Sequence, residues 1–300
     1  MLDQQTQLCA ELSSVRDFIR YGASEFNRAG LYFGHGTDNA WDEAVQLVCA
    51  AISLTGFDNP AILEARLTHS EKLAVLDYFV RRIEKRMPAA YITRHARFCG
   101  LDFYVDERVL VPRSPIAELI EQNFAPWLLD APEYILDLCT GSGCIGIACA
   151  YQFPDAQVAL SDISADALAV AERNVAEHDL SYRVKTVQSD LFAGLAGQCF
   201  DLIVSNPPYV DEEDLAAMPA EFQAEPEIGL GSGADGLAFT RRLLSEVPNY
   251  LNDGGLLVVE VGNSAAALVE AFPDLPFTWV EFERGGHGVF VLTREQLVAG

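Results

Sequence analysis

The chain has little lysine and no paired cysteine motif. Only three of its 20 basic residues are lysine, against 44 Asp and Glu, and the formal net charge is −24 at pH 7. The seven cysteines are odd in number and form no Cys-x-x-Cys pair, which indicates a reducing cytoplasm rather than a disulfide framework. Cys139, Cys144 and Cys149 have no histidine cluster beside them, so we expect no metal site.

Long apolar runs are also missing. No basic stretch followed by an apolar run opens the sequence, so we expect no secretory signal. The longest uncharged segment, residues 138–154, contains three glycines together with Ser, Thr and Gln, and is not a membrane span. With 50% hydrophobic residues over 300 positions, we expect a globular cytoplasmic protein of one large and one smaller domain, with no membrane partner.

The acidic charge is concentrated in the second part of the chain. Residues 1–100 hold 11 Lys/Arg and 12 Asp/Glu, a net of −1, whereas residues 101–300 hold 9 and 32, a net of −23. A surface this acidic repels phosphate backbones and attracts a basic protein, so we expect no direct nucleic acid recognition. Solubility alone is the alternative explanation of this charge.

The spacing of apolar residues changes along the sequence. Three- and four-residue spacing predicts helices over residues 12–26, 41–54 and 70–86, with Thr37, Asp38 and Ser70 as candidate caps. Residues 89–111 read as a short hairpin. We therefore predict a helical domain over residues 1–88, a β-hairpin linker over 89–112 and a third region over 113–300.

The third region alternates short apolar runs with helical segments, which is typical of an α/β fold with a parallel sheet covered on both faces. The connection between the last two runs, residues 278–282 and 289–292, is too short for a helix and is rich in glycine. We therefore expect the final strand to be antiparallel. The predicted strands cover residues 134–138, 158–160, 184–187, 202–204, 256–261, 278–282 and 289–292.

A glycine-rich turn follows the first of these strands. Gly141, Gly143 and Gly146 match the GxGxxG pattern, and Asp162 at the end of the next strand is placed to accept from ribose hydroxyls. NAD and S-adenosylmethionine both carry that ribose, but a carboxylate at Asp137 suits an ammonium group and favours S-adenosylmethionine. The predicted cofactor-binding residues are Asp137, Cys139, Thr140, Gly141, Ser142, Gly143, Asp162, Asp190, Leu191 and Asn206.

The fourth predicted strand ends in the step Asn206-Pro207-Pro208-Tyr209. Two prolines stiffen the backbone and leave its carbonyls unpaired within the turn, so an Asn oxygen and a neighbouring carbonyl form two rigid acceptors. That pair suits a planar –NH₂ group, and Tyr209 offers a flat surface beside it. We predict all four as catalytic residues; an ordinary strand-ending turn is the alternative reading.

Together these residues resemble class I methyltransferases, and more narrowly the HemK/PrmB family of protein-glutamine methyltransferases. The resemblance covers nearly the whole chain and includes the glycine loop, the Asn-Pro-Pro-Tyr step and residues 88–92, 103–106, 109–113, 161–164, 225–227 and 235–237. It implies a Rossmann-like fold, S-adenosylmethionine as cofactor and transfer of a methyl group to a glutamine amide. The N-terminal helices would then recognise the protein substrate.

Two branches of that family differ after the Pro-Arg pair. The release-factor branch typically reads Pro-Arg-Pro-Asp/Glu-Thr-Glu, whereas residues 112–118 here are similar to the ribosomal-protein branch, as are residues 34–39 and 41–44. This implies that the substrate is a basic large-subunit ribosomal protein, the third of that subunit. A release-factor glutamine methyltransferase is the nearest alternative.

Three other classes share part of the pattern. An adenine amino-methyltransferase would use the same Asn-Pro-Pro-Tyr step, but it needs positive charge to hold a nucleic acid backbone. An NAD-dependent dehydrogenase would explain the glycines alone. A non-catalytic module that has kept the fold would not need an intact Asn-Pro-Pro-Tyr step.

Overall fold

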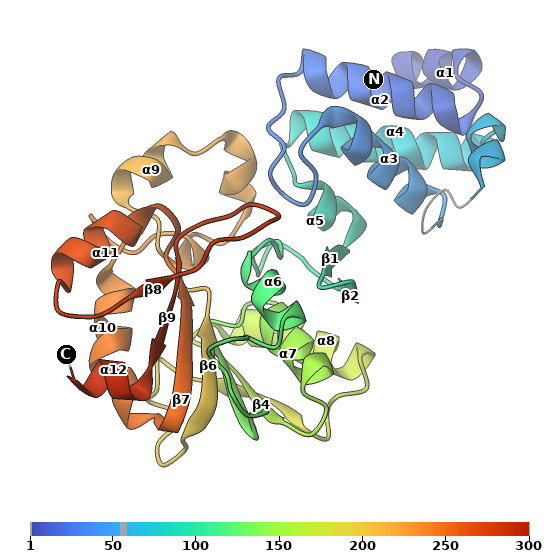
Figure 1. Ribbon diagram of the computed structural model, residues 1–300. Helices are drawn as coiled ribbons and strands as arrows, with labels where there is room; N and C mark the ends of the chain where they lie inside the picture. Colours follow the sequence, from blue (N-terminus) through green and yellow to red (C-terminus); the bar gives the residue numbers. More distant parts are fainter. Residues whose placement is uncertain (1, 55–58, 300) are drawn as a thin grey trace. The chain divides into compact units, whose positions relative to one another are not determined.

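The computed structural model describes residues 2–54 and 59–299. The chain divides into two compact units, Met1–His95 with Pro219–Ala224, and Ala96–Met218 with Glu225–Gly300 (Figure 1). The first unit thus includes a short segment from far along the sequence. Residues 1, 55–58 and 300, which fall within the predicted domains 1–88 and 113–300, lie outside the described ranges.

The first unit is helical, as the apolar spacing predicts. Its N-caps are Ser14, Asn39 and Thr68, each of which accepts a hydrogen bond from a backbone N–H of the first helical turn. The caps predicted at Thr37, Asp38 and Ser70 are therefore wrong by one or two residues. The helices are α1 (Leu2–Glu11), α2 (Val15–Arg28), α3 (Ala40–Ala51), η1 (Pro60–Glu64), α4 (His69–Glu84), α5 (Ala89–Thr93) and η2 (Ala220–Ala224).

The core of this unit forms where α2, α3 and α4 pack together (Figure 1). Phe18 and Phe26 of α2 and Leu47 of α3 are fully buried, and Phe79 of α4 meets Phe26 edge to face. A Cβ at Gly22 would lie 2.5 Å from the Phe79 ring, so the close approach of α2 to α4 requires glycine there.

A buried ion cluster joins α3, α4 and the returning segment of the first unit. The Arg82 Nε donates to Glu43 Oε1 at 2.6 Å, and Arg82 Nη1 lies 3.4 Å from Glu221 Oε1. Glu221 also accepts from the Tyr32 backbone N–H at 3.1 Å and from Arg86 at 3.3 Å. Arg82 and Glu43 are each about 1% exposed, so the cluster is removed from water and its charges compensate one another.

The second unit begins with a hairpin of β1 (Ala96–Phe98) and β2 (Leu101–Phe103), inside the range predicted as a linker. In the second unit, helices separate most of the strands that follow the hairpin. These elements are α6 (Ile116–Glu121), β3 (Tyr134–Leu138), α7 (Cys144–Gln152), β4 (Gln157–Asp162), α8 (Ala165–Glu177), β5 (Val184–Gln188), β6 (Phe200–Ser205), α9 (Glu212–Ala217), η3 (Glu227–Gly229), α10 (Ala238–Glu246), η4 (Val247–Asn249), β7 (Leu251–Glu260), η5 (Gly262–Ser264), α11 (Ala265–Ala271), β8 (Thr278–Trp279), β9 (Val289–Thr293) and α12 (Arg294–Ala299).

The main sheet has seven strands in the order β5-β4-β3-β6-β7-β9-β8. Strands β3 to β7 pair in parallel, and β9 pairs antiparallel with both β7 and β8. The predicted α/β class and the antiparallel last strand are therefore confirmed. The predicted strand 278–282 is shorter, because only Thr278 and Trp279 pair with β9.

Successive residues of each central strand point to opposite faces of the sheet, and both faces are buried. Ile135 and Val204 belong to the core on the face covered by α6, α7 and α8, whereas Leu136 and Ile203 belong to the core covered by α10, α11 and α12 (Figure 1). This two-sided burial explains why these strands read as continuous apolar runs rather than as alternating patterns.

The buried ion cluster gives a direct test of the first unit. Replacement of Arg82 by Leu leaves the carboxylates of Glu43 and Glu221 buried without their main cation, so we expect the free energy of unfolding to fall by about 3–5 kcal/mol. Guanidinium unfolding followed by circular dichroism measures the loss. The matched control is Arg16→Leu, because the Arg16–Glu64 pair is 56% and 68% exposed and should contribute only a small fraction of that amount. Equal losses in the two variants would contradict the assignment.

Candidate active site

The predicted site residues follow the carboxyl ends of neighbouring parallel strands. The chain leaves β3, β4, β5 and β6 at the same edge of the sheet, in the turns that contain residues 139–143, 163–164, 189–191 and 206–209. The strand order reverses at β3, which has β4 on one side and β6 on the other. Ligands of open α/β sheets bind outside such a reversal, so this edge of the sheet is the candidate ligand site.

The carboxylate of Asp137 organises the glycine loop. Its Oδ2 accepts from the Thr140 hydroxyl at 2.5 Å and from the Gly146 backbone N–H at 2.8 Å. Its Oδ1 is buried and accepts no hydrogen bond from any described residue. Burial raises the pKa of Asp137 to about 6, because an ionised carboxylate loses its hydration there.

The loop itself has the left-handed backbone that glycine favours. Gly141 has φ +54° and Gly143, the N-cap of α7, has φ +83°, while Cys139 takes φ +61° without being glycine. At Gly146 the need is for space, because a Cβ would lie 2.2 Å from a Leu160 methyl and 2.9 Å from the Asp137 Cβ. Each glycine of the predicted pattern therefore has a steric reason.

The second strand contributes Asp162, whose carboxylate bridges two turns. Its Oδ2 accepts from the Gly141 N–H at 3.0 Å and its Oδ1 from the Ser164 N–H at 2.9 Å. Burial raises its pKa, although these backbone donors oppose the shift. Each oxygen still has capacity for a further donor, as a carboxylate that meets ribose hydroxyls needs.

Asn174 supports the loop from α8, and the sequence analysis missed it. Its fully buried side-chain amide donates to the Ser142 and Tyr104 carbonyls at 2.8 and 3.0 Å, and its oxygen accepts from the Tyr104 N–H at 2.8 Å. An Asn within an amphipathic helix carries no local signal of this role, because its partners are distant in the sequence.

Asp190 and Leu191 lie at the end of β5 with unequal surroundings. The Asp190 carboxylate is 53% exposed and lies 3.0 Å from an Arg242 nitrogen, so its side chain does not cap a helix. Leu191 is 3% exposed, has φ +50° and packs into the core on the α10 side of the sheet. Little of the Leu191 side chain is thus available to a ligand.

The Asn-Pro-Pro-Tyr step leaves its two predicted acceptors without partners. Neither the Asn206 side chain nor the Pro207 carbonyl makes a hydrogen bond with a described residue, although Asn206 is half-buried and Pro207 is buried. Tyr209 is tied at both ends: its carbonyl accepts from Ser264 Oγ at 2.8 Å and its hydroxyl donates to Glu260 Oε1 at 2.9 Å. Burial, and then the nearby Glu260, raises the pKa of Tyr209, so this hydroxyl stays protonated.

The Pro-Arg segment is held by a second buried carboxylate. Arg113 donates to both oxygens of Glu225, at 2.6 and 2.7 Å, and the Val111 N–H donates to the same carboxylate at 2.9 Å. The pair therefore joins the Pro-Arg segment to a residue that follows the Asn-Pro-Pro-Tyr step in the sequence. The bidentate geometry fixes direction as well as distance.

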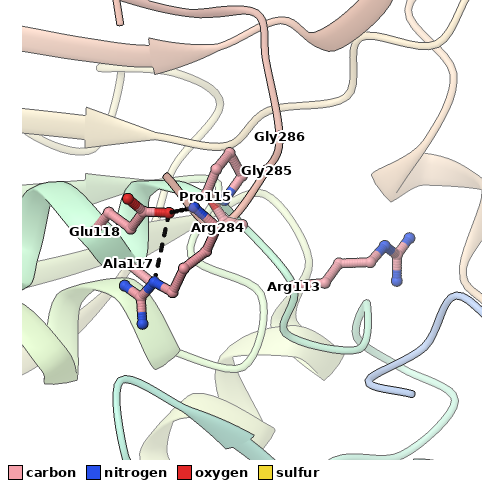
Figure 2. Close-up of a pocket in the computed structure, with 8 residues that line it drawn as sticks. Arg113, Pro115, Ala117, Glu118, Arg284, Gly285 and Gly286 are labelled. Carbon is pink, nitrogen blue, oxygen red and sulfur yellow. Dashed lines mark hydrogen bonds and ion pairs between the residues drawn. The ribbon is translucent and has the colours of Figure 1, made fainter. Parts of the chain in front are cut away.

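A pocket of about 310 Å³ opens beside this segment. Glu118 is ion-paired with Arg284 at its floor and accepts from the Glu283 and Arg284 N–H groups, while the Arg113 guanidinium points away from them (Figure 2). None of the predicted cofactor-binding residues lines it. The lining residues are Arg113, Ser114, Pro115, Ala117, Glu118, Arg284, Gly285 and Gly286.

Residues 2–54 and 59–299 provide no candidate metal site and no candidate membrane span. Within these ranges no three His, Cys, Asp or Glu side chains gather as a metal would require, and all seven cysteines are free. No helix there has both the length and the apolar character to cross a membrane.

The sheet order and the glycine loop define a methyltransferase of the class I, Rossmann-like type. A family model described as "Methyltransferase small domain" matches residues 120–225. The hMettl16 catalytic domain, solved in complex with MAT2A 3'UTR hairpin 6, has the same fold with a TM-score of 0.50 and 18% identity, over 74% of this chain and 80% of that one.

Two full-length relatives narrow the class to a family. The "Ribosomal protein uL3 glutamine methyltransferase" of Francisella tularensis subsp. tularensis is 50% identical over 99% of this chain and 96% of its own length. The protein of the same description from Neisseria gonorrhoeae is 49% identical over 97% of this chain and 98% of its own. This chain belongs to the ribosomal protein uL3 glutamine methyltransferase family.

The raised pKa of Asp137 predicts a pH-dependent effect on the ligand-free protein. Because the folded-state pKa of about 6 lies above the ordinary value of 3.8, the folded chain binds this proton more tightly, and the resulting stability is lost as pH rises between these values. An Asn side chain has no proton to lose in this range. The stability of Asp137→Asn relative to wild type should therefore rise by about 2 kcal/mol from pH 4 to pH 7 and then level off.

Denaturant unfolding across this pH range measures the difference, and titrations common to both proteins cancel. The control is Asp155→Asn, the same substitution at an exposed residue. A flat difference curve for Asp137→Asn would refute the raised pKa.

Proposed function

We propose that this protein transfers a methyl group from S-adenosylmethionine to the side-chain amide nitrogen of a glutamine in ribosomal protein uL3. The observation that carries the proposal is the identity of 50% and 49% to two uL3 glutamine methyltransferases over almost the whole chain. The unpaired acceptors of the Asn-Pro-Pro-Tyr step give this chemistry a physical basis in the chain itself.

The residues at the carboxyl edge of the sheet fit S-adenosylmethionine. Asp137 has a buried oxygen without a partner, which suits the ammonium group, and no atom lies within 4 Å of the position of a Cβ at Gly141. Asp162 retains acceptor capacity for the ribose hydroxyls. Cys139, Thr140, Ser142 and Gly143 would line the same turn, with Asp190, Leu191 and Asn206 at its sides.

The glutamine amide would be held by two acceptors. The Asn206 Oδ1 and the Pro207 carbonyl oxygen each accept one amide proton, which fixes the plane of the –NH₂ group and turns one lobe of the nitrogen toward the donor. Pro208 keeps the backbone rigid between them and Tyr209, whose ring packs against the glutamine side chain.

The bound cofactor supplies an activated methyl group on a sulfonium centre. The protein then needs to position the acceptor and to stabilise the positive charge that develops on the amide nitrogen. Asn206 and Pro207 would do this with oxygens that stay hydrogen-bonded to the two N–H groups as their positive character grows. The bond from the methyl carbon to sulfur would break as the bond to nitrogen forms, the donor would leave as a neutral thioether, and one amide proton would pass to water. Tyr209 is not a base, because its hydroxyl is neutral and donates to Glu260.

The protein substrate is proposed to meet the helical first unit, which would make that unit the recognition domain. Tyr32 and Trp41 of this unit are 46% and 47% exposed, as aromatic anchors of a protein contact would be. The 32 acidic residues of positions 101–300 would attract a basic ribosomal protein and disfavour RNA. The free cysteines fit a reducing cytoplasm as the place of action.

Asn206→Ala tests the catalytic step. The variant should bind S-adenosylmethionine with little change but lose about 10²–10³ in kcat, as enzymes do when one preorganised polar group is removed. Calorimetry measures the binding, and transfer of labelled methyl to purified unmethylated uL3 measures turnover. The matched control is Asn249→Ala, since Asn249 is an exposed residue of η4 and should leave both quantities unchanged. A near-normal rate for Asn206→Ala would remove Asn206 from the mechanism.

Mass spectrometry of ribosomal proteins and release factors, from cells lacking the gene and from the parent, tests the substrate. We expect a uL3 peptide containing glutamine to lose the mass of one methyl group in the mutant cells. If only a release-factor glutamine lost the methyl group, uL3 would be the wrong substrate, whereas methylation of a glutamine amide would remain the right reaction. If neither protein changed while adenine methylation fell, the methyl acceptor would be a nucleic acid base rather than a glutamine amide.

A further inference from the structure

The last residue of β7, Glu260, reaches the Asn-Pro-Pro-Tyr step from the other side of the site. It is 6% exposed, and both of its carboxylate oxygens are occupied by hydroxyl donors of residues distant in the sequence. Oε1 accepts from the Tyr209 hydroxyl at 2.9 Å, and Oε2 accepts from the Ser114 hydroxyl at 2.6 Å. No sequence pattern singled out this glutamate.

Burial of an ionised carboxylate whose hydrogen-bond donors are neutral hydroxyl groups lowers the stability of the folded protein. The nearest cation in the same network, Arg113, is paired with Glu225 rather than with Glu260. Burial accordingly raises the pKa of Glu260, and hydrogen bonds from hydroxyl groups return only part of the lost hydration. An apolar residue at this position would fill the core at lower cost, so a role in stability alone does not account for it.

The position of Tyr209 depends on this carboxylate. Among the side chains of residues 206–209, that of Tyr209 alone makes a hydrogen bond with a described residue, through its hydroxyl. Its ring lies against Gly262, where a Cβ would approach to 2.6 Å, and Ser264 holds its carbonyl. The ring is thus held by its edge at Glu260, by its face at Gly262 and by its backbone at Ser264.

We propose that Glu260 is a positioning residue for methyl transfer, which holds the Tyr209 ring at the angle that the acceptor side chain packs against. The inference rests on the proposed function. The two prolines restrict the backbone dihedrals between Asn206 and Tyr209. Holding Tyr209 in place therefore also fixes the directions of the Asn206 side chain and the Pro207 carbonyl. Ser114 lines the pocket of Figure 2 and donates its hydroxyl to Glu260, so it connects that pocket to the same carboxylate.

The test uses three variants of the full chain: Glu260→Met, Tyr209→Phe and the double variant. Met has a similar length but carries no oxygen that could accept from the Tyr209 hydroxyl, and Phe removes only that hydroxyl. Each single variant should lower kcat on purified unmethylated uL3 roughly tenfold, the effect of one hydrogen bond to a charged group. The dissociation constant for S-adenosylmethionine and the KM for uL3 should change less than about twofold, because binding contacts remain.

The double variant separates positioning from stability. If Glu260 acts through Tyr209, the double variant should be no slower than either single variant, because both remove the same bond. The control is Glu270→Met, which changes an exposed glutamate of α11 and should leave kcat unaltered. Should Glu260→Met fail to fold, as melting temperature would reveal, Tyr209→Phe alone decides: a wild-type kcat overturns the inference.

Two further outcomes count against the proposal. Losses that multiply in the double variant would mean that Glu260 acts independently of Tyr209. A wild-type enzyme that does not methylate uL3 would overturn the proposed function and this inference together, whereas an active wild type with an unaffected Tyr209→Phe would overturn the inference alone.

Discussion

The glycine-rich turn that follows β3 depends on one buried carboxylate, that of Asp137. It holds Thr140 before the helix and Gly146 within the helix, so the loop and the start of α7 move as one piece. The interaction is strong because the surroundings exclude water, and for the same reason an ionised Asp137 is costly. Such a conflict between stability and charge is common where a protein must receive a charged ligand.

The acceptor side has a comparable arrangement, built on two consecutive residues. Arg113 and Ser114 reach two different buried carboxylates, Glu225 after the Asn-Pro-Pro-Tyr step and Glu260 at the end of β7. The Pro-Arg segment thereby ties together two parts of the chain that follow different strands of the sheet.

Local patterns in the sequence predicted much of this protein, and long-range contacts account for what was missed. The strand over residues 134–138, the antiparallel last strand and the glycine loop follow from periodicity, turn chemistry and sterics, which act between neighbours. Asn174, Ser114 and Glu260 act on partners 32 to 146 positions away, which no window of sequence contains. The helix caps were misplaced by one or two residues, because several polar residues compete for the role near each helix start.

Residues 219–224 have a consequence for how the protein can be divided. They lie late in the chain, yet they pack as part of the first unit, where Glu221 joins Arg82 and Arg86. A chain cut before residue 96 would keep this fragment but lose every helix that buries it, leaving a carboxylate whose cations are gone. The two units are therefore not interchangeable: exchange of the helical first unit between relatives would need two simultaneous grafts, one before residue 96 and one at residues 219–224.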